Sequence, residues 1–209
     1  MIDVILPENR FAFAQALLEM HHDRKRVFID RLGWDLPSRQ SWLEIDEFDS
    51  EYAVYLISRE SGTGRHQASV RLLPSTQPHV LASLFPGLCE QSVPVAEDCW
   101  EISRLLASPA QINGTALVRV HRLLALALVE FALLNQIRSY SLVIEADRVP
   151  ALLSVGWDVR PLGLPTLCED RQLQALQIEI AEDTLRVTRS RLGFERSVLR
   201  SIAAELRAA

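Results

Sequence analysis

The chain has 209 residues, of which 48% are hydrophobic and 23% are charged. These values are ordinary for a globular protein, and the length suits one large domain or two small ones with a sizeable core. The net charge of −5 gives no reason to expect nucleic-acid binding.

We expect a cytoplasmic protein that does not insert into a membrane. The start of the chain lacks the basic region and apolar run of a secretory signal. The longest apolar run, residues 123–134, is interrupted by Glu130 and is shorter than the roughly 20 residues of a membrane span. The three cysteines are odd in number, which favours reduced thiols. The five histidines form no ligand pattern, so we expect no metal site.

The first predicted element is a helix over residues 10–30, capped by Asn9. At helical spacing, Arg24 falls inside an apolar stripe that includes Phe28. A guanidinium in that place either needs carboxylate partners or extends its stem along the stripe to water. After the helix, Trp34 is either a loop anchor or an aromatic wall for a ligand.

Acidic side chains then gather in segment 44–49, where apolar residues tie the segment to a core. Charge runs of this kind are usually solvated loops. Two strands are predicted next, over residues 52–57 and 67–73, and the short connection between them favours an antiparallel pair. Arg71 lies within the second strand.

Residues 100–106 are typical of a strand, because bulky and β-branched residues dominate. Alternation places Glu101 and Ser103 on one face and Arg104 on the other. A buried charge is costly unless it is paired. The two charged residues are therefore either halves of structural ion pairs or groups that act on a substrate.

A long helix over residues 113–136 is apolar nearly all round and is therefore expected to be covered on most sides. The remaining elements are a strand, a short helix and two strands, at residues 140–145, 147–156, 157–162 and 173–180. The arginine-rich remainder is typical of amphipathic helices that dock on the body or on a second subunit. We predict an α/β fold on a mixed sheet over residues 1–182, followed by a helical tail over residues 183–209.

Several motifs occur in order along the chain: Arg24-x-x-x-Phe28-x-x-x-Leu32-Gly33-Trp34, Asp46-Glu47-Phe48-Asp49, Val70-Arg71-Leu72-Leu73-Pro74, Phe85-Pro86, and Trp100-Glu101-Ile102-Ser103-Arg104. This series resembles the acyl-homoserine-lactone synthases, the LuxI-type autoinducer synthases of bacterial quorum sensing, over about residues 5 to 180.

The resemblance implies a three-layer αβα sandwich similar to that of N-acetyltransferases, with a widened V between two central strands for the acyl donor. It implies that the α-amine of S-adenosylmethionine attacks an acyl thioester. The methionyl carboxylate then displaces methylthioadenosine and closes the lactone. No metal or bound cofactor is expected, since S-adenosylmethionine is a substrate.

The resemblance assigns each matching residue a role that suits its chemistry. Glu101 is the candidate base, directly or through one water, and Ser103 or strand N–H groups are candidate donors to the thioester oxyanion. Aspartate side chains suit the ammonium group of the substrate. Arginine side chains suit carboxylates, either that of the substrate or those of the aspartates. Aromatic rings suit the adenine and the sulfonium. The residues expected to bind S-adenosylmethionine are Arg24, Phe28, Trp34, Asp46, Asp49, Arg71 and Arg104.

The acyl chain is expected in an apolar pocket between the sheet and the last helices, although core packing is the commoner role for any one such residue. The predicted lining is Leu105, Leu124, Leu128, Ile144, Leu152 and Leu153. Segment 143–146 carries no threonine of the kind that members making 3-oxo products often have, so an unsubstituted chain is favoured.

Acyl carrier protein is the expected acyl donor, with acyl-CoA as the alternative. Because the carrier and this chain are both acidic, docking needs a local basic patch. Residues 150–155, where carrier-dependent members tend to be basic, have no charge, and residues 161–165 resemble the acyl-CoA branch. A patch could come from Arg119, Arg122, Arg138, Arg148, Arg160 and Arg171.

Two other functions stay open at this point, and the sequence does not define the oligomeric state. One is an N-acyltransferase of the related fold that uses acyl-CoA on another amine. Enzymes of that kind bind phosphate with a Gly-rich turn. This chain offers only Asn113-Gly114 in the corresponding place, which argues against this function. The other is a non-catalytic sensor of S-adenosylmethionine, against which the intact Glu101 argues.

Overall fold

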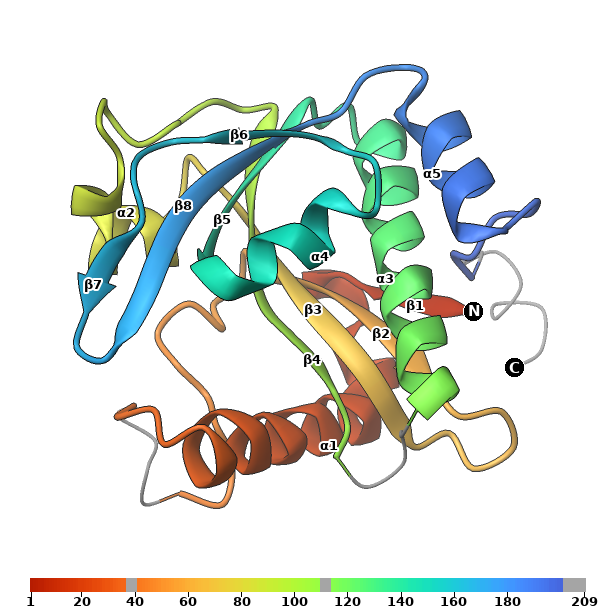
Figure 1. The fold of residues 1–209 in the computed structure, drawn as a ribbon. Coiled ribbons are helices and arrows are strands. Elements are labelled where there is room, and N and C mark those ends of the chain that lie inside the picture. Colours follow the sequence, from red (N-terminus) through yellow and green to blue (C-terminus); the bar gives the residue numbers. More distant parts are fainter. Residues whose placement is uncertain (37–40, 110–113, 201–209) are drawn as a thin grey trace. The chain divides into compact units, whose positions relative to one another are not determined.

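The computed structural model describes residues 1–36, 41–109 and 114–200. The chain divides into two units, each built from separate stretches of sequence. The first unit joins residues 1–71, 104–127 and 198–209, and the second joins residues 72–103 and 128–197. Figure 1 shows the helices and strands that make up both units.

In the first unit, strands β1 (Ile2–Ile5), β2 (Val54–Arg59) and β3 (His66–Pro74), the last of these up to Arg71, follow one another in the sheet. β1 pairs antiparallel with β2, with Ile2 opposite Ser58. The two strands predicted at residues 52–57 and 67–73 are therefore present within two residues of their predicted bounds. β1 was not predicted, because four residues carry too little periodicity to distinguish a strand from a loop.

The predicted helix over residues 10–30 consists of three segments of different winding. A 3₁₀ helix, η1 (Pro7–Phe13), leads into α1 (Ala14–Arg24), which continues as a π-helix, η2 (Lys25–Arg31). Asn9 lies inside η1, and its Oδ1 accepts a hydrogen bond from the Leu6 amide at 2.9 Å. The wider π turn changes the angular spacing of side chains directly after Arg24, as such turns often do at functional sites.

The second unit contains β4 (Cys99–Ala107) only up to Ser103, and its sheet order is β4, β5 (Ser139–Glu145), β8 (Arg171–Glu179) and β6 (Asp158–Pro161). The short β7 (Thr166–Cys168), which was not predicted, pairs with β8. β4 and β5 are parallel, and β5 and β8 are antiparallel, so the sheet is mixed as predicted.

The other helices of the described residues are α2 (Val80–Leu84), η4 (Pro86–Leu88), α3 (Gly114–Leu134), η5 (Ala146–Arg148), α4 (Val149–Leu153) and α5 (Thr184–Leu192). α3 confirms the predicted long helix, and η5 with α4 form the predicted short one. α2 was not predicted, because it is short and lies in a proline-rich stretch, which is typical of a loop. No helix among the described residues is long and apolar enough to cross a membrane.

The two faces of the sheet in the second unit have different neighbours. Trp100 packs edge-to-face on Phe131 of α3, with ring centroids 5.9 Å apart, and the Tyr140 hydroxyl donates to the Leu128 carbonyl of α3 at 3.0 Å. Because side chains alternate along a strand, Glu101 and its neighbours at odd positions lie on the face opposite α3.

The segment after residue 183 packs against the rest of the chain at several points. In the second unit, Trp157 Nε1 donates to Thr188 Oγ1 of α5 at 3.1 Å, and Arg189 of α5 forms an ion pair with Glu130 of α3 at 2.8 Å. In the first unit, the Ile2 amide donates to the Val198 carbonyl at 2.7 Å. The boundary at residue 182 stays a prediction, and residues 201–209 lie outside the described part of the chain.

Candidate active site

Arg24, the last residue of α1, is fully buried between two carboxylates of the first unit. Its Nε donates to Glu44 Oε2, and its Nη1 and Nη2 donate to the two oxygens of Asp49 at 2.7 and 3.0 Å. Of the two arrangements considered for Arg24, carboxylate pairing is the one observed. The bidentate contact with Asp49 fixes the orientation of the Arg24 guanidinium and balances its positive charge.

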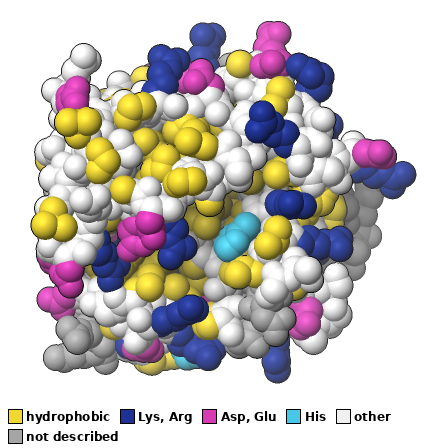
Figure 2. All heavy atoms as spheres, viewed as in Figure 1, with side chains coloured by type: hydrophobic (Ala, Val, Ile, Leu, Met, Phe, Trp, Pro, Cys, Tyr) yellow, Lys and Arg dark blue, Asp and Glu magenta, His cyan; other side chains and the backbone are white. Residues whose placement is uncertain are grey.

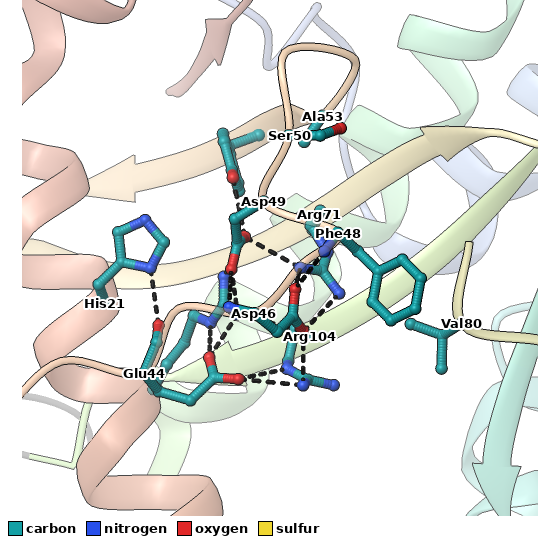
Figure 3. A network of polar contacts seen from close by, with 12 residues as sticks. His21, Glu44, Asp46, Phe48, Asp49, Ser50, Ala53, Arg71, Val80 and Arg104 are labelled. Atoms are coloured by element: carbon teal, nitrogen blue, oxygen red, sulfur yellow. Dashed lines mark hydrogen bonds and ion pairs between the residues drawn. The ribbon is translucent and has the colours of Figure 1, made fainter. Parts of the chain in front are cut away.

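Arg71 of β3 is 1% exposed and binds the same acidic segment from the sheet. Its Nη1 and Nη2 donate to the two oxygens of Asp46, and Nη1 also donates to Asp49 at 2.9 Å. Asp49 is therefore shared by Arg24 and Arg71. Figure 3 shows Asp46, Asp49 and Arg71 pointing toward one another.

Arg104 of β4 completes the cluster from an unusual backbone position. Its φ is +52°, in the left-handed region that non-glycine residues rarely adopt. Nε and Nη2 donate to Glu44 at 3.1 and 3.0 Å, and Nη2 also donates to Asp46 at 2.7 Å. The regular alternation predicted for this strand is interrupted at Arg104.

Two aromatic rings border the Arg104 guanidinium. Phe28 and Trp34 are stacked with centroids 4.7 Å apart and an interplanar angle of 24°. The guanidinium carbon of Arg104 lies 5.5 Å from the Phe28 centroid and 5.6 Å from that of Trp34, within cation–π range. Trp34 therefore stacks on Phe28 beside Arg104, and its role as an aromatic wall for a ligand stays a prediction.

The three arginines are not electrostatically equivalent. Burial alone would lower the pKa of Arg24, but Asp49 and Glu44 raise it above its usual range. The pKa of Arg71 is likewise raised, since the contacts with Asp49 and Asp46 outweigh its burial. The pKa of Arg104 is lowered, first by burial and then by repulsion from Arg71, which outweigh its carboxylate partners. Arg104 is thus the least compensated cation in the cluster.

The carboxylate between the arginines is strongly held in its ionised form. Burial alone would raise the pKa of Asp49, but Arg24 and Arg71 hold it well below its usual range. The Tyr55 hydroxyl donates to Asp49 Oδ1 at 2.8 Å, and the Asp46 amide donates to Oδ2 at 2.8 Å. Both oxygens of Asp49 therefore already accept several hydrogen bonds.

Three members of this network were not predicted as site residues. Glu44 is fully buried and links Arg24 to Arg104, and its carbonyl lies 2.8 Å from the ring Nδ1 of His21. Tyr55 is the third. Glu44 was visible only as one acid in an acidic segment, where nothing in the spacing separates it from the exposed Glu47.

Glu101, the candidate base, lies in the second unit and is 1% exposed. Its Oε1 accepts a hydrogen bond from the Val80 amide at 3.0 Å, and its Oε2 accepts one from the Leu81 amide at 2.6 Å. The first turn of α2 thus fixes both carboxylate oxygens. α2 was absent from the sequence-based prediction, so this support for Glu101 was missed with it.

The pairing of β4 with β5 ends next to Glu101. It covers Cys99–Ile102 and Ser139–Leu142, although both strands continue beyond those residues. Ser103, the other predicted catalytic residue, is half-buried at the first position past the paired segment. The widened V for the acyl donor, which the resemblance implies, stays a prediction.

The predicted acyl-pocket residues differ in exposure and are divided between the units. Leu124 in the first unit and Leu128 in the second are buried, whereas Leu105 and Leu153 are 44% and 49% exposed. Ile144 and Leu152, both in the second unit, are half-buried. Their role as a pocket stays a prediction.

The geometry provides a paired cluster of three arginines and three carboxylates beside two stacked rings, and separately a buried carboxylate at the end of a strand pairing. Within the described residues, no group of three or more His, Cys, Asp or Glu side chains could hold a metal ion. The model of one protein family, described as autoinducer synthase, matches residues 10–187.

The chain belongs to the autoinducer synthase family. It is an acyl-homoserine-lactone synthase of that family, and thus an acyltransferase. The isovaleryl-homoserine lactone synthase of Bradyrhizobium diazoefficiens is 30% identical over 197 residues, which are 93% of this chain and 86% of that protein.

Solved structures of autoinducer synthases agree with the fold. The CoA-dependent acyl-homoserine lactone synthase BjaI, solved with SAM and isopentyl-CoA, matches 100% of this chain and 98% of its own with a TM-score of 0.87 and 29% identity. The CoA-dependent synthase MesI matches 96% and 100% of the two chains with a TM-score of 0.85 and 26% identity. An acyl-CoA N-acyltransferase from Pseudomonas aeruginosa, 18% identical over 87% of this chain and 99% of its own, shares the fold alone, with a TM-score of 0.53.

Proposed function

We propose that this autoinducer synthase takes a short, branched acyl group from acyl-CoA and transfers it to the α-amine of S-adenosylmethionine. The observation that carries this choice of donor is the likeness over the whole chain to BjaI, whose structure was solved with SAM and isopentyl-CoA. The relative named isovaleryl-homoserine lactone synthase supports the same choice. Acyl-CoA was the alternative in the sequence analysis, behind acyl carrier protein.

The arginines that were candidates for carrier docking support this choice. In the second unit, four of the six lie within ion-pair distance of an acid of the chain itself. Arg138 lies 3.6 Å from Asp98, and Arg160 lies 3.2 Å from Glu179. The other two both lie near Glu145, Arg148 at 3.5 Å and Arg171 at 3.3 Å. Charge that is balanced by neighbouring acids attracts an acidic carrier less strongly.

The surface of α4 also favours a donor other than a carrier protein. Figure 2 shows hydrophobic side chains gathered on the face where Figure 1 places α4. Pro150 and Ala151 are exposed there, and Leu153 is 49% exposed. A basic helix surface, which would attract an acidic carrier, is therefore not found on α4.

We assign the carboxylate of S-adenosylmethionine to Arg104. Its Nε and Nη2 bind Glu44 and Asp46, whereas no bond from Nη1 to a described residue is found. Figure 3 shows that nitrogen pointing away from the cluster. The lowered pKa of Arg104, caused first by burial and then by Arg71, means that an added anion would compensate this cation. Phe28 and Trp34 would flank the sulfonium and the adenine.

Asp46 and Asp49 would act mainly by holding the arginines in place. The oxygens of Asp46 accept bonds from Arg71, from Arg104 and from the Phe48 amide, and those of Asp49 are equally occupied. Direct contact of either aspartate with the substrate ammonium, which the resemblance implied, stays a prediction. A positioning role needs no rearrangement of these bonds.

The chemistry has two steps, each with its own leaving group, and only the first needs a base. Glu101 accepts a proton from the substrate amine, directly or through a water, and the amine nitrogen forms a bond to the thioester carbon. The carbon–sulfur bond breaks, and CoA leaves as a thiolate. In the second step the methionyl carboxylate displaces methylthioadenosine from its own γ-carbon, which depends on positioning.

The test compares donors with the purified chain. Isovaleryl-CoA and isovaleryl-acyl carrier protein are each supplied with S-adenosylmethionine, and both lactone and methylthioadenosine are measured. We expect the CoA donor to give the higher kcat/KM, with little dependence on salt, since screening mainly weakens contacts between exposed charges. A faster, salt-sensitive reaction with the carrier donor would restore the carrier as the donor.

Methylthioadenosine release also separates this function from its alternatives. An ordinary N-acyltransferase would use acyl-CoA without releasing methylthioadenosine, and a sensor would bind S-adenosylmethionine without making lactone. Location in the cytoplasm stays a prediction.

A further inference from the structure

Ser141 of β5 carries a buried hydroxyl group that the fold does not use. The residue is 0% exposed, and its Oγ has no hydrogen-bond partner among the described residues. A hydroxyl is both a donor and an acceptor, and leaving it unsatisfied in the interior is costly. Such a group in a native structure calls for an explanation.

Ser141 lies directly beside the candidate base in the sheet. In the parallel pairing of β4 and β5, Ser141 is the register partner of Glu101. Register partners in neighbouring strands present their side chains on the same face. Tyr140, the preceding residue, bonds to α3 on the opposite face. The hydroxyl and the carboxylate therefore share the face away from α3.

The position also lies at the end of the strand pairing. Only one further pair, Ile102 with Leu142, follows before the pairing of β4 and β5 ends. On its other side, Ser141 is the register partner of Gln177 in β8. The hydroxyl thus sits in a row of polar side chains, with Glu101 on one side and Gln177 on the other, close to where the pairing of β4 with β5 ends.

Ser139 provides the comparison that makes Ser141 unusual. It lies two residues earlier on the same face of the same strand and is also buried, at 6% exposure. Its hydroxyl lies within hydrogen-bond reach of the Cys99 thiol, and Cys99 is its register partner. Of these two buried serines of β5, the one that lacks a partner is the one beside Glu101.

We propose that the Ser141 hydroxyl donates a hydrogen bond to the carbonyl oxygen of the bound acyl thioester. This inference rests on the proposed function, because it needs an acyl donor beside Glu101. As the amine nitrogen bonds to the carbonyl carbon, the carbonyl π electrons move to oxygen, and Ser141 stabilises that oxyanion. The oxyanion then re-forms the carbonyl and expels the thiolate. Ser141 keeps its own proton throughout.

This role gives activity and stability opposite responses to one substitution. Ser141→Ala removes a donor that acts in the transition state, and loss of such a donor typically lowers kcat by about 10²–10³-fold. The same substitution removes an unsatisfied buried group from the free protein, so its Tm should stay the same or rise. A residue needed only for packing or folding would lower both.

The experiment uses three variants of the full chain. Ser141→Ala is compared with Ser139→Ala, the matched control, and with Glu101→Gln, under saturating S-adenosylmethionine and acyl-CoA. We expect Ser141→Ala to lower kcat with little change in the KM for S-adenosylmethionine and no fall in Tm. Ser139→Ala should keep kcat near that of the unaltered chain.

Two results would overturn the proposal. An unchanged kcat in Ser141→Ala means that the hydroxyl does not contact the reacting carbonyl. A fall in its Tm means that the hydroxyl has a structural partner in the free protein. Failure of the proposed function looks different, because the unaltered chain would then make no lactone from acyl-CoA.

Discussion

Arg104 donates two hydrogen bonds to one oxygen of Glu44, from Nε at 3.1 Å and from Nη2 at 3.0 Å, while its own backbone is left-handed, with φ of +52°. That conformation costs a non-glycine residue about 1–2 kcal/mol. Strain of this kind persists only when the surrounding contacts compensate for it. The bonds to Glu44 and Asp46 and the rings of Phe28 and Trp34 are those contacts.

The strain at Arg104 can be measured by comparing two truncations. Arg104→Gly and Arg104→Ala both remove the guanidinium, so both should raise the KM for S-adenosylmethionine. Glycine adopts a positive φ without strain, so Arg104→Gly should be more stable than Arg104→Ala by about 0.5–1 kcal/mol, after allowing for the greater freedom of glycine in the unfolded chain. Urea unfolding of both variants checks this. Equal or reversed stability would show that the backbone is not strained in solution.

Glu44 should be essential to the cluster. Glu44→Gln leaves Arg24 and Arg104 with less compensation in a buried place, and breaking a buried ion pair costs about 3–5 kcal/mol. Glu47→Gln is the matched control, because Glu47 belongs to the same segment but is exposed. We expect a large fall in unfolding free energy for the first variant and almost none for the second. Similar values for the two would contradict the assignment.

Glu101→Gln should separate catalysis from binding. Loss of a general base lowers kcat by about 10²–10⁴-fold, while S-adenosylmethionine is bound by other residues and should keep its KM. The glutamine oxygen can still accept one of the two amides of α2, from Val80 or Leu81. Steady-state kinetics with methylthioadenosine as the measured product test this. A variant with full kcat would remove Glu101 from the mechanism.

Asp49 should make the protein sensitive to acid. Burial would raise its pKa, but Arg24 and Arg71 lower it in the folded state, so its contribution to stability is present above the unfolded pKa of about 3.9. That contribution is lost as the pH falls through the folded pKa. The difference in unfolding free energy between the unaltered chain and Asp49→Asn should therefore be largest near neutral pH and shrink in acid. The exposed Glu51 provides the control, Glu51→Gln, and a difference that does not vary with pH would contradict this prediction.

The cluster shows what a sequence reveals about a site and what it does not. Arg24 was visible because a charge inside an apolar helical stripe breaks the pattern. Glu44 and Tyr55 break no pattern, since one lies among other acids and the other in an ordinary strand. Their roles depend on how the segment over residues 44–49 folds back onto α1 and β3, and local spacing does not encode such long-range contacts.

The fold, like the site, was predictable in part from the sequence. The mixed sheet, the long helix α3 and most strands were predicted from periodicity, whereas β1, β7 and α2 are too short to show any. The π-helical winding of η2 and the left-handed Arg104 are local departures from regular structure, and both occur at the site. They are stabilised by tertiary contacts, and so the sequence alone did not indicate them.

The pairing of β1 with residues near 198 has a consequence for synthesis of the chain. The Ile2 amide bonds to the Val198 carbonyl, and the Arg200 amide bonds to the Ile2 carbonyl. β1 leaves the ribosome long before these partners, because they lie far downstream in the sequence. The first unit therefore cannot complete its structure on a partly made chain, and truncation before residue 198 should leave the edge of β1 exposed to aggregation.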